Sequence, residues 1–339
     1  MLVSILIPCR NERDYIEKCL DSVLAMTRPS GVEIEILVLD GLSTDGTPDI
    51  VKHIAAREPL VGFHTNPGRV QSAAMNVGLV CAKGDWIMRL DAHSFYPNDY
   101  LGECLSTAIR TGADNVGGLF ITQPGADSYE GQLVQALTTH KFGVGDSGFR
   151  TDINEGPVDT VPYGFYRRSV FSKFGGFDER LVRAQDYEFN RRIRKMGGVI
   201  YLNPKIRVYY FNQKTLYRFL RKQVVLEAPY NAYLWYVAPY AFTPRHAITG
   251  LFSSGVICGA VLSYYSQLLL TVYVAVLASY GLLSVVASMQ QAMRYRRPVH
   301  IIALPLCFFA FHFFHGLGIL SGLVRLATYT APVQRTSVK

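Results

Sequence analysis

The stretch Met88-Arg89-Leu90-Asp91-Ala92-His93-Ser94 closes a buried-type apolar run with a carboxylate and an imidazole two positions apart. Alternate residues of an extended chain point to the same side, so Asp91 and His93 are expected to face one crevice. Together they suit a divalent cation held against a phosphate. An isolated Asp-x-His is more often a helix cap beside a surface histidine, so this interpretation depends on the surrounding strands.

The segments before this stretch alternate between strand and helix patterns. Short apolar runs are each followed by residues whose apolar positions recur three and four apart, which is typical of an amphipathic helix. The predicted strands cover residues 3–8, 33–39, 61–64 and 86–90, and the predicted helices cover about 16–24, 47–57 and 70–82. Repeated βα units predict an α/β fold with a doubly wound, parallel sheet.

Polar residues follow three of these strands. Asn11, expected to cap the first helix, and Glu12 follow the first strand, Asp40 follows the second, and Asp91 with His93 follows the fourth. Ligands of open parallel sheets bind outside the carboxyl ends of the strands. The three groups are therefore expected to meet at one edge of the sheet and to form a nucleotide site.

The chain after Pro97 is less regular. Helices are predicted over 98–111, 129–140 and 167–174 and from residue 184, and strands over 115–122 and 161–166. Residues 141–159 are rich in glycine and show no periodicity. This segment is long for a loop, which favours a mobile lid or acceptor loop, with a disordered surface insertion as the alternative.

Charge and hydropathy point to a membrane rather than to nucleic acid. The chain of 339 residues carries a net charge of +8, and between Tyr201 and Arg245 seven Lys or Arg face one acid, Glu227. Residues 246–293 and 298–324 then contain no Asp, Glu, Lys or Arg. A cationic zone that leads into long apolar segments is typical of a juxtamembrane region.

Three membrane spans are predicted, at about 247–265, 268–289 and 300–322. Pro305, Gly316 and Gly318 leave open that the third is a re-entrant hairpin. The arginines at 294, 296 and 297 lie between the second and third spans, which by the positive-inside rule puts that loop and the N-terminal domain in the cytoplasm. The expected site is thus on the cytoplasmic side of the cell's inner membrane.

The predicted domains are a catalytic domain over 1–210, a juxtamembrane segment over 211–245, the spans within 246–326 and a tail over 327–339. In the second of these, Thr215 is expected to cap an amphipathic helix lying in the membrane interface; a helix packed on its own domain is the alternative. The six cysteines show no Cys-x-x-Cys, which predicts neither a zinc site nor a disulfide framework. The N-terminal apolar run is short and lacks a basic leader, so it is predicted to be a strand rather than a signal peptide.

Taken in order, five motifs resemble those of a family 2 inverting glycosyltransferase with the GT-A fold, and most closely its ExoA-like subgroup of succinoglycan biosynthesis. They are Ile7-Pro8-Cys9-Arg10-Asn11-Glu12, Asp40-Gly41-Leu42-Ser43-Thr44-Asp45-Gly46-Thr47, Gly84-Asp85-Trp86-Ile87-Met88-Arg89-Leu90-Asp91-Ala92-His93, Gly175-Gly176-Phe177-Asp178-Glu179 and Gln185-Asp186. The resemblance covers residues 1 to about 210. It implies a Rossmann-like, mostly parallel sheet followed by an α-helical membrane region.

The resemblance also implies roles for single residues. Those expected to bind the nucleotide are Pro8, Asn11, Glu12, Asp40, Arg69 and Asp91. Asp91 and His93 match the Asp-x-Asp motif that holds the ribose and a metal, and the histidine favours Mn²⁺ over Mg²⁺. Asp186 matches the general base.

The implied reaction moves a hexose from a UDP-sugar such as UDP-glucose to a polyprenyl-diphosphate-linked saccharide in exopolysaccharide assembly. A polyprenyl-phosphate sugar synthase and a non-catalytic, nucleotide-binding membrane scaffold are the alternatives. Gly41 and Gln185 stand where the family usually has acidic residues. The Gln-x-x-Arg-Trp motif of processive synthases is absent, because the segment from Gln223 lacks its Arg and Trp, so a single addition is expected.

Overall fold

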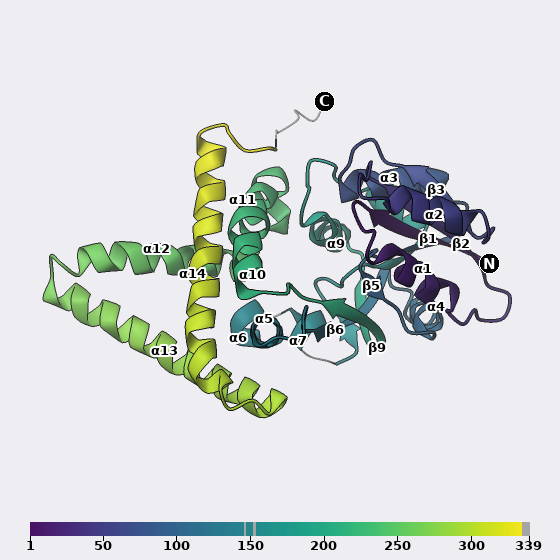
Figure 1. Ribbon diagram of the computed structural model, residues 1–339. Coiled ribbons are helices and arrows are strands. Elements are labelled where there is room, and N and C mark those ends of the chain that lie inside the picture. The colour runs from purple at the N-terminus through teal and green to yellow at the C-terminus, as the bar shows by residue number, and fades with distance from the viewer. Residues whose placement is uncertain (146, 152–153, 334–339) are drawn as a thin grey trace. The chain divides into compact units, whose positions relative to one another are not determined.

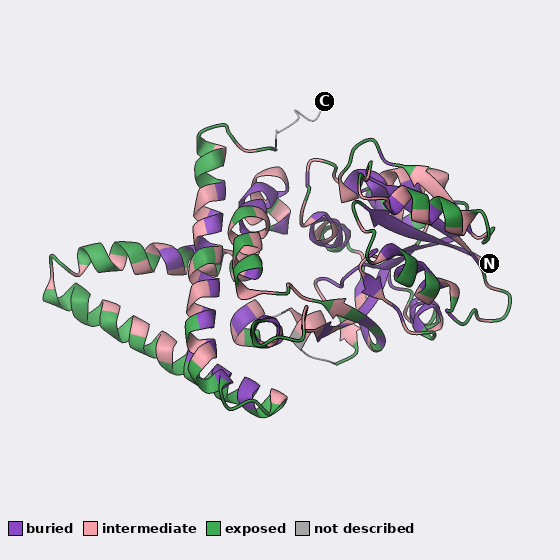
Figure 2. Ribbon diagram, in the orientation of Figure 1, coloured by how far each residue is buried: buried purple, intermediate pink, exposed green. Residues whose placement is uncertain are grey.

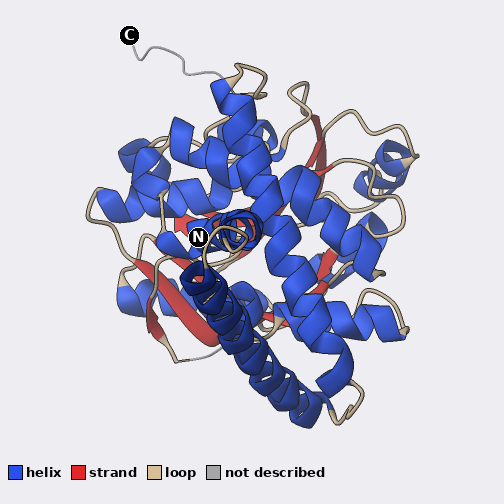
Figure 3. Ribbon diagram, turned by 90° about the vertical axis from the view of Figure 1, so that its left-hand side faces the viewer, coloured by secondary structure: helices blue, strands red, loops and turns tan. Residues whose placement is uncertain are grey.

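The computed structural model describes residues 1–145, 147–151 and 154–333. By its contacts the chain forms two compact units, one of residues 1–121 and 152–211 and the other of residues 122–151 and 212–339. Residues 122–151, which the sequence analysis assigns to the catalytic domain, therefore cluster with the C-terminal helices. Apart from the end of one strand, the described strands lie in the first unit, and the second unit is built of helices (Figure 3).

The first unit is built on a nine-stranded sheet with the order β3-β2-β1-β4-β8-β6-β9-β5, and β7 pairs with β9 (Figure 1). The strands are β1 Leu2–Cys9, β2 Glu33–Asp40, β3 Val61–Thr65, β4 Trp86–Arg89, β5 Ser94–Phe95, β6 Asn115–Gln123, β7 Gly156–Pro157, β8 Phe165–Arg167 and β9 Ile200–Phe211. The expected α/β fold is confirmed.

Strands β3, β2, β1 and β4 form the parallel half of the sheet. Strand β1 lies at its centre and is buried over Val3–Cys9, which explains its nearly unbroken apolar sequence. Cys9 pairs with Asp40 in register, so the ends of β1 and β2 lie side by side. The carboxyl ends of three predicted strands therefore meet at one edge, as the sequence predicts.

The other half of the sheet is antiparallel. The strands predicted over 115–122 and 161–166 correspond to β6 and β8, whereas strand β9 and the antiparallel pairing were not predicted. Strand β8 pairs antiparallel with β4 and β6, and β9 pairs antiparallel with β5 and β7. In β9, Ile206 and Val208 are buried while Lys205 alternates with them on the other face. This period of two is the pattern of a strand buried on one side, and it places part of the basic zone on the first unit.

Six helices flank this sheet in the chain. They are α1 Ile16–Leu24, α2 Thr47–Ala55, α3 Gln71–Cys81, α4 Tyr100–Thr111, α8 Ser169–Phe174 and α9 Gln185–Lys195. Asn11 does not cap α1, because the helix begins at Ile16 behind Tyr15 and Asn11 adopts a left-handed φ of 58°. Its side chain is used instead in the loop described below.

The second unit contains three helices that are long and apolar enough to cross a membrane, α12 Pro244–Leu262, α13 Gln267–Tyr295 and α14 His300–Ala327 (Figure 1). The shorter helices are α5 Tyr129–Thr138, α6 Lys141–Val144, α7 Gly148–Thr151, α10 Leu216–Lys222, the π-helix Gln223–Glu227, α11 Ala228–Val237 and the 3₁₀ turn Pro239–Ala241. Helices α12 and α13 expose most of their apolar surface (Figure 2). The expected α-helical region is confirmed.

Helix α14 runs through Pro305 without a break, so the third apolar segment is one continuous helix and not a re-entrant hairpin. The glycines of this helix allow close packing instead. A Cβ at Gly316 would lie 2.0 Å from the carbonyl oxygen of Thr249 in α12, and one at Gly318 would lie 2.7 Å from the Cβ of Ala228 in α11. Small residues at such positions let membrane helices approach closely.

One buried cluster joins α5, α10 and α14. It includes Val134 and Leu137 of α5, Phe219 of α10 and Phe308 and Phe311 of α14. The apolar side of α10, which the sequence analysis placed in the membrane interface, therefore packs on protein within its own unit.

The last turns of α13 are tied to the end of α5 by polar contacts. Gln291 donates to the carbonyl of Ala136, and Arg294 donates to that of Thr139 at 3.0 Å. A helix of 29 residues is about 44 Å long at 1.5 Å per residue, which exceeds the thickness of the hydrocarbon core of a bilayer. The contacts hold the last turns of α13 against α5 within the second unit.

The glycine-rich segment begins as part of this unit. Phe142, in α6, lies with its ring 5.1 Å from that of Phe308 and 5.3 Å from that of His312. Residues 146, 152 and 153 of the expected lid, and residues 334–339 of the expected tail, lie outside the described residues.

Candidate active site

The loops that follow β1 and β2 are tied to each other. The backbone N–H of Asn11 donates to Ser43 Oγ at 2.8 Å, and Asn11 Oδ1 accepts from the N–H of Thr44 at 2.9 Å. The N–H of Glu12 donates to Thr47 Oγ1 at 2.9 Å. These contacts fix Asn11 and Glu12 beside the end of β2.

Asp40 ends β2 and is buried, with 2% of its surface exposed. Its Oδ2 accepts from the N–H of Ser43 at 3.0 Å, and its Oδ1 accepts from the Cys9 thiol at 3.8 Å. Burial, and then the neighbouring carboxylate of Asp40, raise the pKa of the Cys9 thiol well above its usual range. Cys9 therefore stays a neutral donor to Asp40.

The turn after β4 is held by Tyr96. Its hydroxyl accepts from the N–H of Asp91 at 2.8 Å and donates to the carbonyl of the same residue at 3.1 Å. Burial raises the pKa of Tyr96, so the phenol keeps the proton that this second bond requires. The backbone of Asp91 is therefore fixed on both sides before any ligand binds.

Arg89 is a buried cation that binds two carboxylates. Its Nη2 lies 2.9 Å from Asp91 Oδ1 and its Nη1 lies 3.2 Å from Asp186 Oδ2, and only 3% of the side chain is exposed. Burial lowers the pKa of a guanidinium, but the carboxylates of Asp91 and Asp186 outweigh this and raise the pKa of Arg89. The guanidinium stays charged, and it also lies over the ring of Tyr163 at 5.3 Å.

The sequence analysis gave Arg89 no role. A charge at an inward position of an apolar strand, two residues before an aspartate, is the signal that could have found it, because a buried charge requires a partner. The contact also brings Asp91 and Asp186, which are 95 positions apart in the sequence, to a single side chain.

His93 and Glu12 form a second pair. His93 Nδ1 lies 3.1 Å from Glu12 Oε1, with 41% of the histidine and 20% of the glutamate side chain exposed. Metal-binding histidines commonly donate one ring N–H to a carboxylate, which turns the other nitrogen towards the metal. Glu12 thus stands in the position of a carboxylate that orients His93.

Two glutamines connect the first turns of helices α3 and α9. Gln71 Nε2 donates to Asp91 Oδ1 at 2.9 Å, and Gln185 Nε2 donates to Gln71 Oε1 at 2.5 Å. Gln71 and Gln185 are the first residues of their helices. The first residue of α3 therefore contacts Asp91, and the first residue of α9 contacts it only through Gln71.

The loop before α9 is fastened to α3. Asn76 Nδ2 donates to the carbonyl of Phe177 at 2.9 Å, and Asn76 Oδ1 accepts from the N–H of the same residue at 2.8 Å. Ser72 Oγ donates to the carbonyl of Leu181 at 3.1 Å. A Cβ at Gly176 would lie 2.6 Å from Asn76 Oδ1, so a larger residue there would displace Asn76 from its contacts with Phe177.

Left-handed backbone is concentrated around this edge. Seven non-glycine residues of the described chain have positive φ, and five belong to the loops of the site: Asn11, Leu42, Arg69, Tyr163 and Ala184. Such conformations cost of order 1–3 kcal/mol each and are commonly found at functional sites. Their clustering marks the edge as a candidate site independently of the charges.

The predicted residues are not all joined. Arg89 joins Asp91 to Asp186, and His93 contacts Glu12. Pro8 is buried inside β1. Arg69 is exposed, and its backbone oxygen would lie 3.4 Å from a Cβ at Gly41. Within the described residues, no hydrogen bond or ion pair links the side chains of Pro8 or Arg69 to the other predicted residues.

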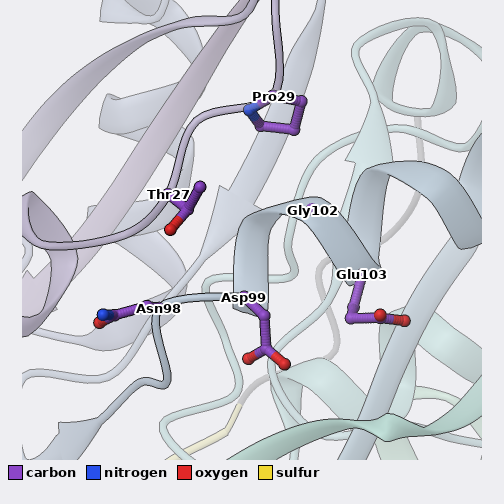
Figure 4. Close-up of a pocket in the computed structure, with 6 residues that line it drawn as sticks. All are labelled: Thr27, Pro29, Asn98, Asp99, Gly102 and Glu103. Carbon is purple, nitrogen blue, oxygen red and sulfur yellow. The ribbon is translucent and has the colours of Figure 1, made fainter.

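A surface hollow elsewhere in the first unit contains none of these residues. It is lined by Thr27, Pro29, Asn98, Asp99, Gly102 and Glu103 (Figure 4). The hollow is open to solvent and lies at the start of α4.

The site residues fit a divalent cation that arrives with a diphosphate. Among the described residues, no three His, Cys, Asp or Glu side chains are grouped as a metal site. Nucleotide enzymes commonly hold such cations with one or two protein ligands and the substrate phosphates. Both described side-chain hydrogen bonds to the Asp91 carboxylate end on Oδ1.

Comparison with known proteins agrees with this architecture. Residues 4–175 match the family described as glycosyl transferase family 2. The chain is 33% identical over 214 residues to the succinoglycan biosynthesis protein ExoA of Rhizobium meliloti, covering 62% of this chain and 64% of that protein, which is less than two thirds of its length.

A second relative covers nearly the whole chain. It is the dolichyl N-acetyl-alpha-D-glucosaminyl phosphate 3-beta-D-2,3-diacetamido-2,3-dideoxy-beta-D-glucuronosyltransferase of Methanococcus voltae. That protein is 26% identical over 340 residues, covering 95% of this chain and 97% of its own length.

Solved structures share the fold. The mannosyltransferase PcManGT from Pyrobaculum calidifontis, in complex with GDP-Man and Mn²⁺, has a TM-score of 0.60 at 18% identity and covers 91% of this chain and 86% of its own. TarS 1-349 of S. aureus in complex with UDP-GlcNAc has a TM-score of 0.51 at 16% identity, with 96% and 92% covered. At these identities the likeness is one of fold.

Proposed function

The chain belongs to glycosyl transferase family 2, and we propose that it is a member of the ExoA-like subgroup that transfers a hexose from a UDP-sugar to a polyprenyl-diphosphate-linked saccharide. It is a glycosyltransferase of polysaccharide or glycan biosynthesis. The non-catalytic scaffold is therefore set aside. The donor sugar and the lipid-linked acceptor are the parts that this proposal adds.

One observation carries the proposal: Arg89 binds Asp91 and Asp186 at once. The first carboxylate follows a parallel strand, where nucleotides bind, and the second lies at the start of α9. An inverting transfer needs the nucleotide of the donor held on one side of the reacting sugar carbon and a base on the other side. Two carboxylates that share a buried cation supply these two functions at a fixed spacing.

In the proposed reaction Asp186 is the base. Its Oδ1 accepts from the N–H of Tyr187 at 2.8 Å, and a third of its side chain is exposed, so an acceptor hydroxyl can reach it. The acceptor oxygen attacks the anomeric carbon as the bond from that carbon to UDP breaks, and the hydroxyl proton passes to Asp186. A single displacement inverts the configuration at that carbon.

On the donor side, Asp91 binds the ribose and, with His93, would hold a divalent cation, for which Mn²⁺ suits the mixed oxygen and nitrogen ligands. The cation would offset the negative charge that grows on the departing UDP. The uridine is proposed to be bound by Pro8, Asn11, Glu12 and Asp40. Arg69, exposed just before α3, is proposed to contact the diphosphate.

The acceptor is inferred from the membrane part and from a relative. The name of the Methanococcus voltae transferase gives an acceptor sugar carried on a lipid phosphate, and that protein matches almost the whole chain, including the apolar helices. We place the chain in the inner membrane with its catalytic unit in the cytoplasm, because the arginines at 294, 296 and 297 follow the second apolar helix.

The test uses the full chain in detergent with radiolabelled UDP-glucose and other UDP-sugars, and with GDP-mannose as a competing donor class. Acceptors are undecaprenyl-diphosphate saccharides of defined length and undecaprenyl phosphate alone. Product on a saccharide primer supports the proposal. Product on undecaprenyl phosphate alone supports the polyprenyl-phosphate sugar synthase instead, and transfer from GDP-mannose only would overturn the choice of nucleotide.

The role of Asp186 has its own test. Asp186→Asn is expected to lower transfer about 10²–10⁴-fold, the usual worth of a general base, while UDP binding measured by titration stays within about twofold. Asp99→Asn, in the separate surface hollow, is the matched control and is expected to keep full activity. An equal loss of transfer and of UDP binding in Asp186→Asn would contradict the assignment.

A further inference from the structure

We propose that Gln71 and Gln185 are positioning residues that close a polar ring with Asp91, Arg89 and Asp186, and that position 185 must be a hydrogen-bond donor for Asp91 to bind the nucleotide sugar. This inference rests on the proposed function, because it assigns the two residues to the donor site defined there. The ring consists of two ion pairs, two hydrogen bonds and the peptide bond between residues 185 and 186.

The direction of the hydrogen bonds in the ring is fixed by chemistry. An ionised carboxylate only accepts hydrogen bonds, so Gln71 must turn its NH₂ group towards Asp91. Its carbonyl oxygen then faces Gln185 at 2.5 Å. A carbonyl oxygen in contact with a side chain that is 96% buried needs a donor there, and an amide supplies one while a carboxylate does not.

The identity of residue 185 supports this requirement. It is the first residue of α9, where the helix dipole favours an acidic side chain. A glutamine stands there instead, and Ala184, the residue before it, has a left-handed φ of 60°. We attribute the absence of an acidic residue at position 185 to the need for a hydrogen-bond donor to the Gln71 carbonyl oxygen.

The ring has a specific consequence for a glutamate at this position. An ionised Gln185→Glu side chain would face the Gln71 carbonyl, and turning the Gln71 amide round would only move the repulsion to Asp91. In either orientation of the Gln71 amide, its carbonyl oxygen faces a carboxylate, either that of the introduced glutamate or that of Asp91. This contact between two acceptors remains until the introduced glutamate takes up a proton. A protonated carboxyl group donates as the amide does, so the defect is expected to be reversed by acid.

The experiment measures KM and kcat for the UDP-sugar and the thermal midpoint of the ligand-free full chain between pH 6 and pH 8. Gln185→Glu is expected to raise KM about tenfold at pH 8, as an unmet buried acceptor does, with kcat changed less, and KM should fall towards the wild-type value at pH 6. Gln213→Glu is the matched control outside the ring and is expected to show no such pH dependence.

The same substitution in a Gln71→Lys background tests the coupling. A lysine ammonium group can donate both to Asp91 and to the new carboxylate, so Gln185→Glu should add little pH-dependent change to KM in that background. An increase in KM that is equal at pH 6 and pH 8, or that is unchanged in the Gln71→Lys background, would overturn the proposal.

The thermal midpoints separate this proposal from the proposed function. Gln185→Glu is expected to lower the midpoint of the ligand-free chain more at pH 8 than at pH 6, and less so in the Gln71→Lys background, where the ammonium group donates to the new carboxylate. If the wild-type chain transfers no sugar but these midpoints follow that pattern, the proposed function fails and the ring stands. If transfer is found and the midpoints do not differ with pH, the ring fails alone.

Discussion

At the scale of single residues, the site is organised by a charge that does not touch a substrate in the proposed reaction. Arg89 is the only described side chain that contacts both Asp91 and Asp186. A planar guanidinium can bind two carboxylates in fixed directions, whereas an ammonium group acts as a single point charge. The spacing of the two carboxylates therefore depends on the shape of this side chain as well as on its charge.

Arg89→Lys is accordingly expected to lower kcat/KM about 10²-fold, since a displacement of about 1 Å between reacting groups costs that much. The buried charge is kept, so the chain should still fold, with UDP binding reduced less than transfer. Radiolabelled transfer and UDP titration on the same preparation measure the two effects. Arg57→Lys, exposed in the turn after α2, is the control; normal transfer by Arg89→Lys would show that the second ion pair is dispensable.

Several residues of the candidate site could be predicted from the sequence because their positions follow from the strand pattern alone. Asp91, His93 and Asp40 stand where apolar runs end, and parallel strands bring such ends together. The pairing of His93 with Glu12, and of Gln71 with Gln185, could not be predicted in this way. These contacts depend on loop conformations such as the left-handed backbone of Asn11 and Ala184. Hydrophobic periodicity does not predict such conformations.

At the scale of elements, the parallel half of the sheet was predicted, whereas in the antiparallel half only strands β6 and β8 were predicted, without their pairing. The first four strands form βα units whose order in the sequence implies their pairing. Strand β9 pairs with short strands far away in the sequence, and its alternation was concealed by Lys205 and Arg207, which were counted as part of a juxtamembrane charge cluster. Local pattern does not reveal such distant pairing.

The loop between α8 and α9 depends on a local ion pair. Asp178 accepts from Arg180 through both oxygens, at 2.9 Å from Nε and 2.6 Å from Nη2. Burial raises the pKa of this carboxyl group, but the hydrogen bonds from Arg180 outweigh burial, so its pKa is lowered. The contribution of the Asp178–Arg180 ion pair to the free energy of unfolding is thus fully present above the unfolded-state pKa of Asp178. It is lost as the pH falls through the lowered folded-state pKa.

Asp178→Asn is therefore expected to reduce the free energy of unfolding by about 1 kcal/mol at pH 7, since the pair is partly exposed. The difference between variant and wild type should stay constant above the ordinary pKa of an aspartate and shrink below it, as the pH falls through the lowered folded-state pKa of Asp178. Thermal unfolding of the full chain at pH 7, 5, 4 and 3 measures it. Asp21→Asn, on the exposed side of α1, serves as the control; a difference that grows towards low pH would be against the argument.

At the scale of the whole molecule, the chain crosses between its two units three times. It leaves the first unit after residue 121, returns at 152 and leaves again after 211. The composition predicted a soluble-type half and an apolar half, because charge is distributed in that way along the sequence. It did not predict that α5 and α6, which lie within the first half, pack with the apolar helices, because the partners of α5 are more than 80 residues away.

This connectivity makes the fragment 1–211 a poor candidate for an independent domain. Cutting at 211 removes α10 to α14 and exposes Leu133, Val134 and Leu137 of α5, which are at most 6% exposed in the full chain. Each such side chain contributes about 1.5–3 kcal/mol when it is buried. The fragment 1–211 is therefore expected to aggregate without detergent, as size-exclusion chromatography would detect.

Co-expression of the two fragments shows whether 1–211 aggregates because the apolar face of α5 is exposed or because the truncated chain is unstable for another reason. The fragment 212–339 supplies Phe219, Phe308 and Phe311, so its presence in the same membrane should keep 1–211 soluble in detergent and let the two fragments purify together. Leu137→Asp in 1–211 should abolish that co-purification, whereas Tyr129→Phe, at the edge of the same helix, should not. A monodisperse 1–211 that binds UDP alone would show that the burial of α5 contributes little, and that the boundary near residue 210 is a true domain boundary.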